Sequence, residues 1–161
     1  MESHVETLIA SLELVAHPEG GWFREVFRSE QATEPGDGRG ERAALSVIYF
    51  LLARGERSRW HGLRSDEQWT FLEGDPLALY LADLERERKE SVLLGPPGDG
   101  HLSTTIVQAG VWQAARTTGA YTLVTCTVGP GFEFQDFRFL EDDPLAAQRL
   151  ASEWPEAAAF L

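Results

Sequence analysis

The chain contains 161 residues, of which 43% are hydrophobic and 25% are charged. These proportions predict one globular domain over residues 1–161 with a core of its own, and they exclude a coiled coil or a disordered protein. Twenty-six acidic residues against fourteen basic ones leave a net charge of −12 at pH 7. Such a surface repels phosphate backbones, so we expect no nucleic-acid partner.

Cys126 is the only cysteine, which excludes an intrachain disulfide and a zinc site built of several thiolates. It lies in the apolar run 121–128, where we expect a buried and unreactive thiol. No apolar run reaches the roughly 18 residues that a membrane-spanning helix needs. The first residues also lack the basic and then apolar layout of a secretory signal. We therefore expect a cytoplasmic protein with no membrane partner.

The first predicted element is a short helix, whose apolar residues recur at helical spacing: Val5, Leu8, Ile9 and Leu12. Ser3 and Glu6 have the spacing of a capping box at its start. We expect His17-Pro18 to end this helix and Gly20-Gly21 to allow a sharp reversal of the chain.

After the helix the pattern changes to apolar runs typical of β-strands, separated by turns rich in glycine and proline. The predicted strands are 22–28, 43–53, 67–73, 77–84, 91–94, 102–108, 111–116, 121–128 and 132–140. A second helix is expected after Asp143, with Pro155 interrupting it. Many short strands between two short terminal helices predict an all-β double-sheet jelly roll, a double-stranded β-helix whose barrel spans about residues 20–140.

His61 is the histidine best placed for chemistry, because it precedes the carboxylate Glu67 by six residues. We expect His4 and His17 to be surface or capping residues rather than ligands, and His101 to be exposed. The two tryptophans Trp60 and Trp112 are expected to be packing residues.

Motif spacing around His61 resembles the cupin superfamily: Gly55, His61, Leu63, Glu67 and Gly74 follow its first motif, and Gln108-Ala109-Gly110 with Gln113 resembles its second. More specifically, five stretches in register resemble the cupin family DUF985 (cupin_5): 17–25, 48–52, 58–63, 65–69 and 128–137. This resemblance implies an RmlC-like jelly-roll barrel that commonly forms a homodimer.

The resemblance also implies a metal site of three histidines and a glutamate, but His61, Leu63, Glu67 and Gln113 occupy these four positions. Leucine cannot bind a metal, and an amide oxygen is a poor ligand for a soft divalent ion. We therefore expect that no cofactor is required. A divalent metal could at most be held weakly by His61, Glu67 and Gln113, with waters completing its shell.

The period of a strand places Trp69 and Phe71 on the same face as Glu67. An indole beside a carboxylate is suited to stacking a flat ring, although Trp69 as a plain core residue is equally consistent with the pattern. The other expected ligand-binding residues are Gln113, Arg24 and Arg59. Four arginines precede the expected pocket and either guide an anionic ligand to it or pair with surface acids: Arg54, Arg57, Arg59 and Arg64.

Two functions remain open, and both concern a small polar ring compound, anionic or uncharged, such as a nucleotide or sugar. In a metal-independent epimerase or isomerase, His61 would take a proton from carbon, Asp66 or Glu67 would orient the ring, and Tyr49 or Tyr121 would return the proton. Alternatively, the same pocket binds its ligand without chemistry. A metal-dependent oxygenase or isomerase is disfavoured by the residues at the ligand positions.

Overall fold

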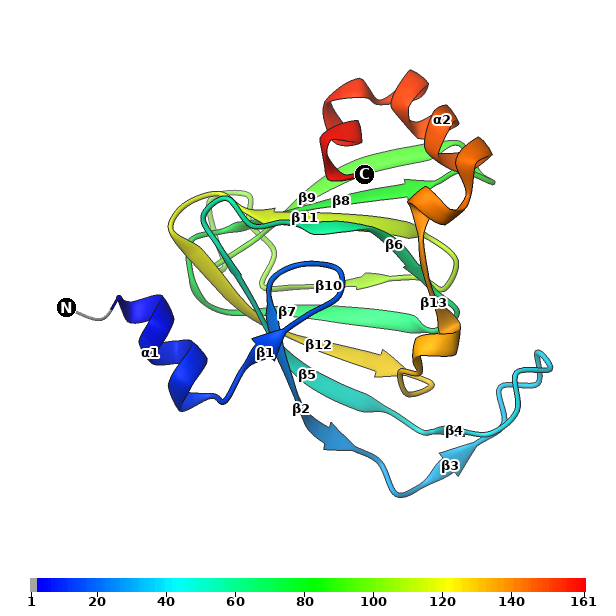
Figure 1. Cartoon of the computed structure of the whole chain (residues 1–161), viewed down its shortest axis with the longest axis horizontal. Coiled ribbons are helices and arrows are strands. Elements are labelled where there is room, and N and C mark those ends of the chain that lie inside the picture. The colour runs from blue at the N-terminus through cyan, green and yellow to red at the C-terminus, as the bar shows by residue number, and fades with distance from the viewer. Residues whose placement is uncertain (1–2) are drawn as a thin grey trace.

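Two facing antiparallel β-sheets make up most of the chain in the computed structural model, which describes residues 3–161 (Figure 1). The larger sheet has the spatial order β1 (Val15–Ala16), β2 (Trp22–Arg28), β5 (Ser46–Ala53), β12 (Tyr121–Gly129), β7 (Asp66–Gly74) and β10 (Thr104–Val107). The smaller sheet has the order β13 (Phe137–Phe139), β6 (Ser58–Leu63), β11 (Trp112–Thr117), β8 (Leu77–Asp83) and β9 (Arg88–Leu94). The all-β jelly roll is confirmed.

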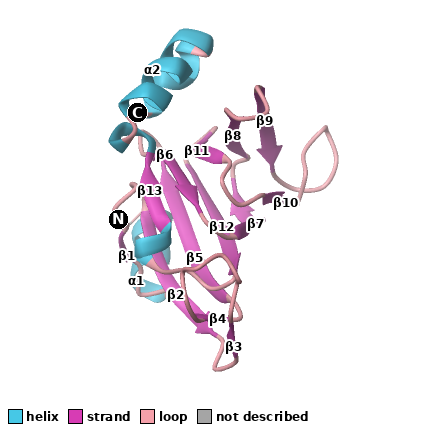
Figure 2. Ribbon diagram, turned by 90° about the vertical axis from the view of Figure 1, so that its right-hand side faces the viewer, coloured by secondary structure: helices cyan, strands magenta, loops and turns pink. Residues whose placement is uncertain are grey.

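A small ribbon of β3 (Ala32–Thr33) and β4 (Arg42–Ala43) projects from one end of the larger sheet (Figures 1 and 2). The buried carboxylate of Asp136 ties this ribbon to the C-terminal part of the chain, because it accepts hydrogen bonds from Arg42 Nε at 2.8 Å and Arg42 Nη2 at 3.0 Å. Asp136 belongs to a 3-10 turn, η1 (Phe134–Asp136), so the predicted strand 132–140 shortens to β13.

The strand β6 is absent from the sequence prediction. Its residues Ser58–Leu63 show no clean alternation and include arginine and glycine, which do not favour a strand. The segment is nevertheless a strand, because it pairs with β11 on one side and β13 on the other and is almost wholly buried. Tertiary pairing therefore overrides a weak local preference at this position.

Terminal helices cover the outer faces of both sheets. The helix α1 (His4–Ser11) begins with the predicted capping box and packs with Leu51 and Leu123 of the larger sheet. It ends well before His17, because Glu13 adopts a left-handed conformation with φ 53°. The part of the chain that the structure describes contains no helix of sufficient length and hydropathy to span a membrane.

The helix α2 (Pro144–Glu153) covers the smaller sheet, and Figure 1 shows it above β8 and β9. Asp143 caps it as predicted, and two further 3-10 turns flank it: η2 (Leu140–Asp142) and η3 (Pro155–Phe160). Trp60 and Trp112 pack beneath it with Leu150 and Phe160, so their predicted packing roles are confirmed.

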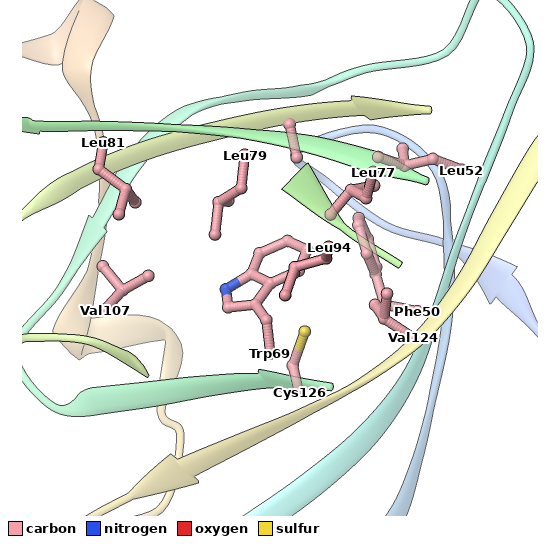
Figure 3. Close-up of a cluster of buried hydrophobic side chains, with 11 residues drawn as sticks. Phe50, Leu52, Trp69, Leu77, Leu79, Leu81, Leu94, Val107, Val124 and Cys126 are labelled. Atoms are coloured by element: carbon pink, nitrogen blue, oxygen red, sulfur yellow. The ribbon is translucent and has the colours of Figure 1, made fainter. Parts of the chain in front are cut away.

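The space between the sheets is filled with apolar side chains at one end only. Figure 3 shows Trp69 surrounded by Phe50, Leu79, Leu94 and Cys126 in this core. Cys126 is 2% exposed, and burial raises the pKa of its thiol, which confirms the buried thiol. Toward the other end of β5, β7 and β12, the inward positions no longer meet a packed partner, and a cavity begins there.

Candidate functional site

A cavity of about 130 Å³ opens between the sheets beyond this core. Its floor carries ionisable groups from β6, β7 and the turn before β2, namely His61, Glu67 and Glu19. Its walls are mainly aromatic, with rings from β2 and β5 on one side and from the segment around η1 on the other: Phe23, Phe50, Phe132, Phe134 and Phe137. The cavity is therefore an apolar space with a titratable floor.

His61 and Glu19 form a buried pair in this floor. The Nδ1 atom of His61 donates to the carbonyl oxygen of Arg59 at 2.7 Å, so its Nε2 atom faces Glu19 Oε2 at 3.1 Å. The other oxygen of Glu19 accepts a hydrogen bond from Ser58 Oγ at 2.8 Å. Burial raises the pKa of Glu19 to about 8 and lowers the pKa of His61. At neutral pH the pair is therefore uncharged, and a proton on Glu19 joins it to the imidazole.

A chain of two hydrogen bonds from the core side of the cavity holds Glu67 in place. Trp69 Nε1 donates to Gln113 Oε1 at 2.9 Å, and Gln113 Nε2 donates to Glu67 Oε2. All three side chains are buried. Burial raises the pKa of Glu67 to about 7, with His61 opposing this rise and Glu19 adding to it. Glu67 therefore gains and loses a proton near neutral pH in a fixed orientation.

From the raised pKa values of Glu19 and Glu67 we predict that the folded state loses stability as the pH rises above neutrality. In the folded chain Glu19 and Glu67 keep their protons to about pH 8 and 7, whereas the unfolded chain releases them near 4.5. The lowered pKa values of His17 and His61 act in the opposite sense, but that effect is complete above about pH 6.5. We expect the free energy of unfolding to fall by about 2 kcal/mol between pH 6.5 and 8.

Urea denaturation followed by circular dichroism at the two pH values measures this fall. Glu19→Gln should flatten it, because the amide keeps a partner for Ser58 but does not titrate. The exposed Glu85→Gln is the control and should retain the full fall. A free energy of unfolding that is constant or rises over this range in the wild type would contradict the prediction.

The structure separates the predicted site residues into two groups. His61 and Glu67 line the cavity, whereas Trp69 and Gln113 lie one layer deeper and support Glu67. The stacking role expected for Trp69 therefore gives way to the core alternative, since its ring is 1% exposed. Phe71 pairs with Val124 in the larger sheet, is only partly buried and does not line the cavity.

Four other predicted residues do not line the cavity. Tyr49 and Tyr121 pack with α1, and the Tyr121 hydroxyl donates to Glu73 at 3.0 Å, so neither tyrosine reaches the cavity. Arg24 pairs with Glu13 at 2.8 Å and Arg59 with Glu141 at 2.7 Å. On β2 it is instead Phe23 and Glu25 that face the cavity. The four arginines 54, 57, 59 and 64 are also absent from the described lining.

The residues at the cupin metal positions do not fit a metal. Leu63 lines the cavity with an aliphatic side chain, and both ends of the Gln113 amide are engaged by Trp69 and Glu67. His61 Nε2, the nitrogen a metal would need, faces Glu19 instead. Within residues 3–161 no group of three or more histidine, cysteine, aspartate or glutamate side chains has the geometry to hold a metal ion.

Glu19 and His17 are the residues of the candidate site that sequence reasoning missed. His17 is expected at the surface but its side chain is only 7% exposed, because the turn through Gly20 and Gly21 folds it against Phe23 and Phe50. The sequence contained a signal for both residues, because both lie in a stretch that carries the family resemblance. All the lining residues except Arg28, Ser46 and Cys126 fall within the five stretches that carry the family resemblance. The five stretches that carry the family resemblance therefore come together around this cavity.

Comparisons with known proteins agree with this geometry. A hypothetical protein from Leishmania major is 32% identical, with 98% of this chain and 96% of that chain covered and a TM-score of 0.82. A Shewanella oneidensis protein is also 32% identical, covers 98% of this chain and 94% of its own, and has a TM-score of 0.81. An uncharacterized yeast protein is 25% identical over 186 residues, which span 99% of this chain and 86% of the yeast protein.

Oxalate decarboxylase from Bacillus subtilis shares the fold alone, at 13% identity and a TM-score of 0.59 over 87% of this chain and 34% of that enzyme. The model of the Cupin superfamily (DUF985) family matches residues 6–140. The barrel, the cavity and this match agree, and the chain belongs to the DUF985 family of the cupin superfamily.

Proposed function

We propose that this protein binds a small polar compound with a single ring in the cavity, and that Glu67 moves a proton on that compound without a metal. The observation that carries the proposal is the position of Glu67. A carboxyl group whose pKa is raised to about 7 stands, held by Gln113, in the floor of an aromatic cavity. A general base works best when its pKa lies near the operating pH.

The size of the cavity supports a single ring. An apolar cavity of about 150 Å³ accommodates benzene, and this one measures about 130 Å³. A nucleotide or a nucleotide sugar would place only one ring inside and leave the remainder outside the mouth. The aromatic walls favour a flat ring, because apolar surfaces of both partners leave water on binding.

The proton step follows from the same contacts. As a carboxylate, Glu67 takes a proton from a carbon next to a carbonyl, so that the C–H bond breaks and an O–H bond forms. The electron pair of that bond moves into the carbonyl as an enolate, and Glu67 returns the proton on the same face to a carbon conjugated with it. This gives an isomer with no oxidant or reductant needed. Gln113 Nε2 stabilises the carboxylate, and the uncharged His61 and Glu19 pair leaves Glu67 free of a fixed cation.

A screen of single-ring compounds by thermal shift and ligand-observed NMR tests the binding step. Compounds that bind should raise the melting temperature of the wild type, because they stabilise the folded state. Ile48→Phe fills the cavity and should abolish the rise, whereas Ile106→Phe, at a side chain 61% exposed outside it, should not. A rise that persists in Ile48→Phe would place the ligand elsewhere and contradict the proposal.

The homodimer and the cytoplasmic location implied earlier stay predictions. Light scattering coupled to size-exclusion chromatography measures the first of them.

A further inference from the structure

The charged groups at the mouth of the cavity are predominantly carboxylates. Glu25 and Glu133 lie there with one cation, Arg28. Four of the five N–H groups of Arg28 are engaged, since it donates to Glu25 at 2.7 and 3.0 Å, to Glu133 at 3.3 Å and to the carbonyl oxygen of Phe132 at 2.9 Å. Two carboxylates against one guanidinium leave the mouth with a net negative charge.

The floor adds no free positive charge. Burial lowers the pKa of His17 to about 4 and also lowers that of His61, so both imidazoles are neutral at pH 7. Glu67 and Glu19 are the other ionisable groups in the floor, and each can only add negative charge. Among the described lining residues, nothing therefore remains to neutralise an anionic ligand inside the cavity.

The aromatic walls of the cavity also favour a cation over an anion. Phe132, Phe134 and Phe137 are mutually steep, with interplanar angles of 83°, 69° and 70° and centroids 5.0 to 6.5 Å apart. Because their planes point in different directions, at least one ring turns its face partly toward the cavity. The face of an aromatic ring carries negative potential and attracts cations.

We propose that the cavity selects a small organic cation, such as a ring bearing an ammonium group or a protonated nitrogen heterocycle, over a neutral or anionic molecule of the same shape. This inference rests on the proposed function and names its ligand class. The cation sits against the phenylalanine faces, with Glu25 and Glu133 as its counter-charges. Loss of a proton from Glu67 strengthens its binding, because the floor then carries a carboxylate.

Three matched probes test the preference: benzylammonium, benzyl alcohol and benzoate, titrated against the full chain at pH 7.5 by ligand-observed NMR. We expect benzylammonium to bind about tenfold more tightly than benzyl alcohol, and benzoate to bind most weakly. If benzoate or benzyl alcohol binds as tightly as benzylammonium, the cation preference is wrong while the binding cavity stands. If none of the three binds, the proposed function fails and the preference fails with it.

A matched pair of variants locates the effect. Glu133→Gln removes one carboxylate at the mouth while Glu25 still holds Arg28, and it should reduce the advantage of benzylammonium over benzyl alcohol several-fold. Glu141→Gln, a nearby carboxylate bound to Arg59 outside the cavity, should leave that advantage intact. An advantage that is the same in Glu133→Gln and wild type would overturn the proposal.

Discussion

Replacing Glu67 by glutamine is expected to lower the rate of proton exchange at carbon on a bound ring compound by about 10²- to 10⁴-fold, the usual worth of a general acid or base. Glutamine keeps the shape of the side chain but cannot accept a proton. Glu67 is the cavity carboxyl whose pKa is raised to about 7, whereas Glu19, with its pKa raised to about 8, is tied to His61 and Ser58.

The measurement is NMR in D₂O of compounds that the binding screen identifies, following the replacement of C–H by C–D. Glu73→Gln is the matched control, because Glu73 lies on the same strand but contacts Tyr121 on the outer face. It should exchange at the wild-type rate. Exchange that is equally fast in Glu67→Gln would refute the catalytic role and leave a binding protein.

Gln113 gives a second readout of the same machinery. Its amide donates to Glu67 and holds the pKa of that carboxyl below the value that burial alone would give. Gln113→Leu should therefore shift the pH dependence of exchange to higher pH. A residue with a merely structural role would change the amount of folded protein but would not move the pH profile.

Replacing Trp60 by alanine is expected to lower the free energy of unfolding by about 3–5 kcal/mol. Trp60 is 1% exposed, and its Nε1 atom donates to the carbonyl oxygen of Ala157 at 2.7 Å. It therefore joins β6 to the C-terminal 3-10 turn through both packing and a hydrogen bond. The loss is a large part of the 5–15 kcal/mol that typical domains have.

Urea denaturation followed by circular dichroism measures this effect. Trp60→Phe keeps most of the buried ring and loses the hydrogen bond, so it should cost less than the alanine variant. Leu145→Ala, at a side chain 80% exposed, is the control and should change the free energy of unfolding by no more than about 0.5 kcal/mol. A loss of under about 1 kcal/mol in Trp60→Ala would contradict the packing described for this face.

The local pattern of the chain was sufficient for many elements. The strand 22–28 lies where the sequence predicts it, and the capping box at Ser3 and the cap at Asp143 both form. These features depend on residues within a few positions of one another, so a single stretch of sequence contains all of their physical causes. The shared face of Glu67 and Trp69 belongs to the same class, since it follows from the period of one strand.

Depth within the barrel could not be deduced in that way. Glu67 and Trp69 share the inward face, but Glu67 lines the cavity while Trp69 is enclosed one step farther along β7. The difference arises from Leu79 and Leu94 of the opposite sheet, which meet Trp69 (Figure 3). No feature of the segment around Trp69 contains that information.

On β5 the sequence likewise does not show which side chains point toward the interior of the barrel. Tyr49 and Phe50 are both aromatic neighbours in a run that is apolar on both sides, because α1 covers the outer face there. Alternation cannot say which of the two points inward when neither face is polar. Tyr49 therefore looked as well placed for catalysis as any inward residue.

The acidic, cysteine-poor composition, the all-β jelly roll and the choice of His61 and Glu67 as site candidates were determined by the sequence, because they depend on residue types and short-range spacing. Only the tertiary structure decided that Glu19 completes the floor, that η1 supplies one wall and that the clustered arginines lie elsewhere. Glu19 and His61 contact each other, and Phe23 and Phe137 line the same cavity, only because the fold brings together residues far apart in the sequence. The net charge of −12 describes the whole chain, whereas a ligand in the cavity would meet only the few groups that the fold brings there.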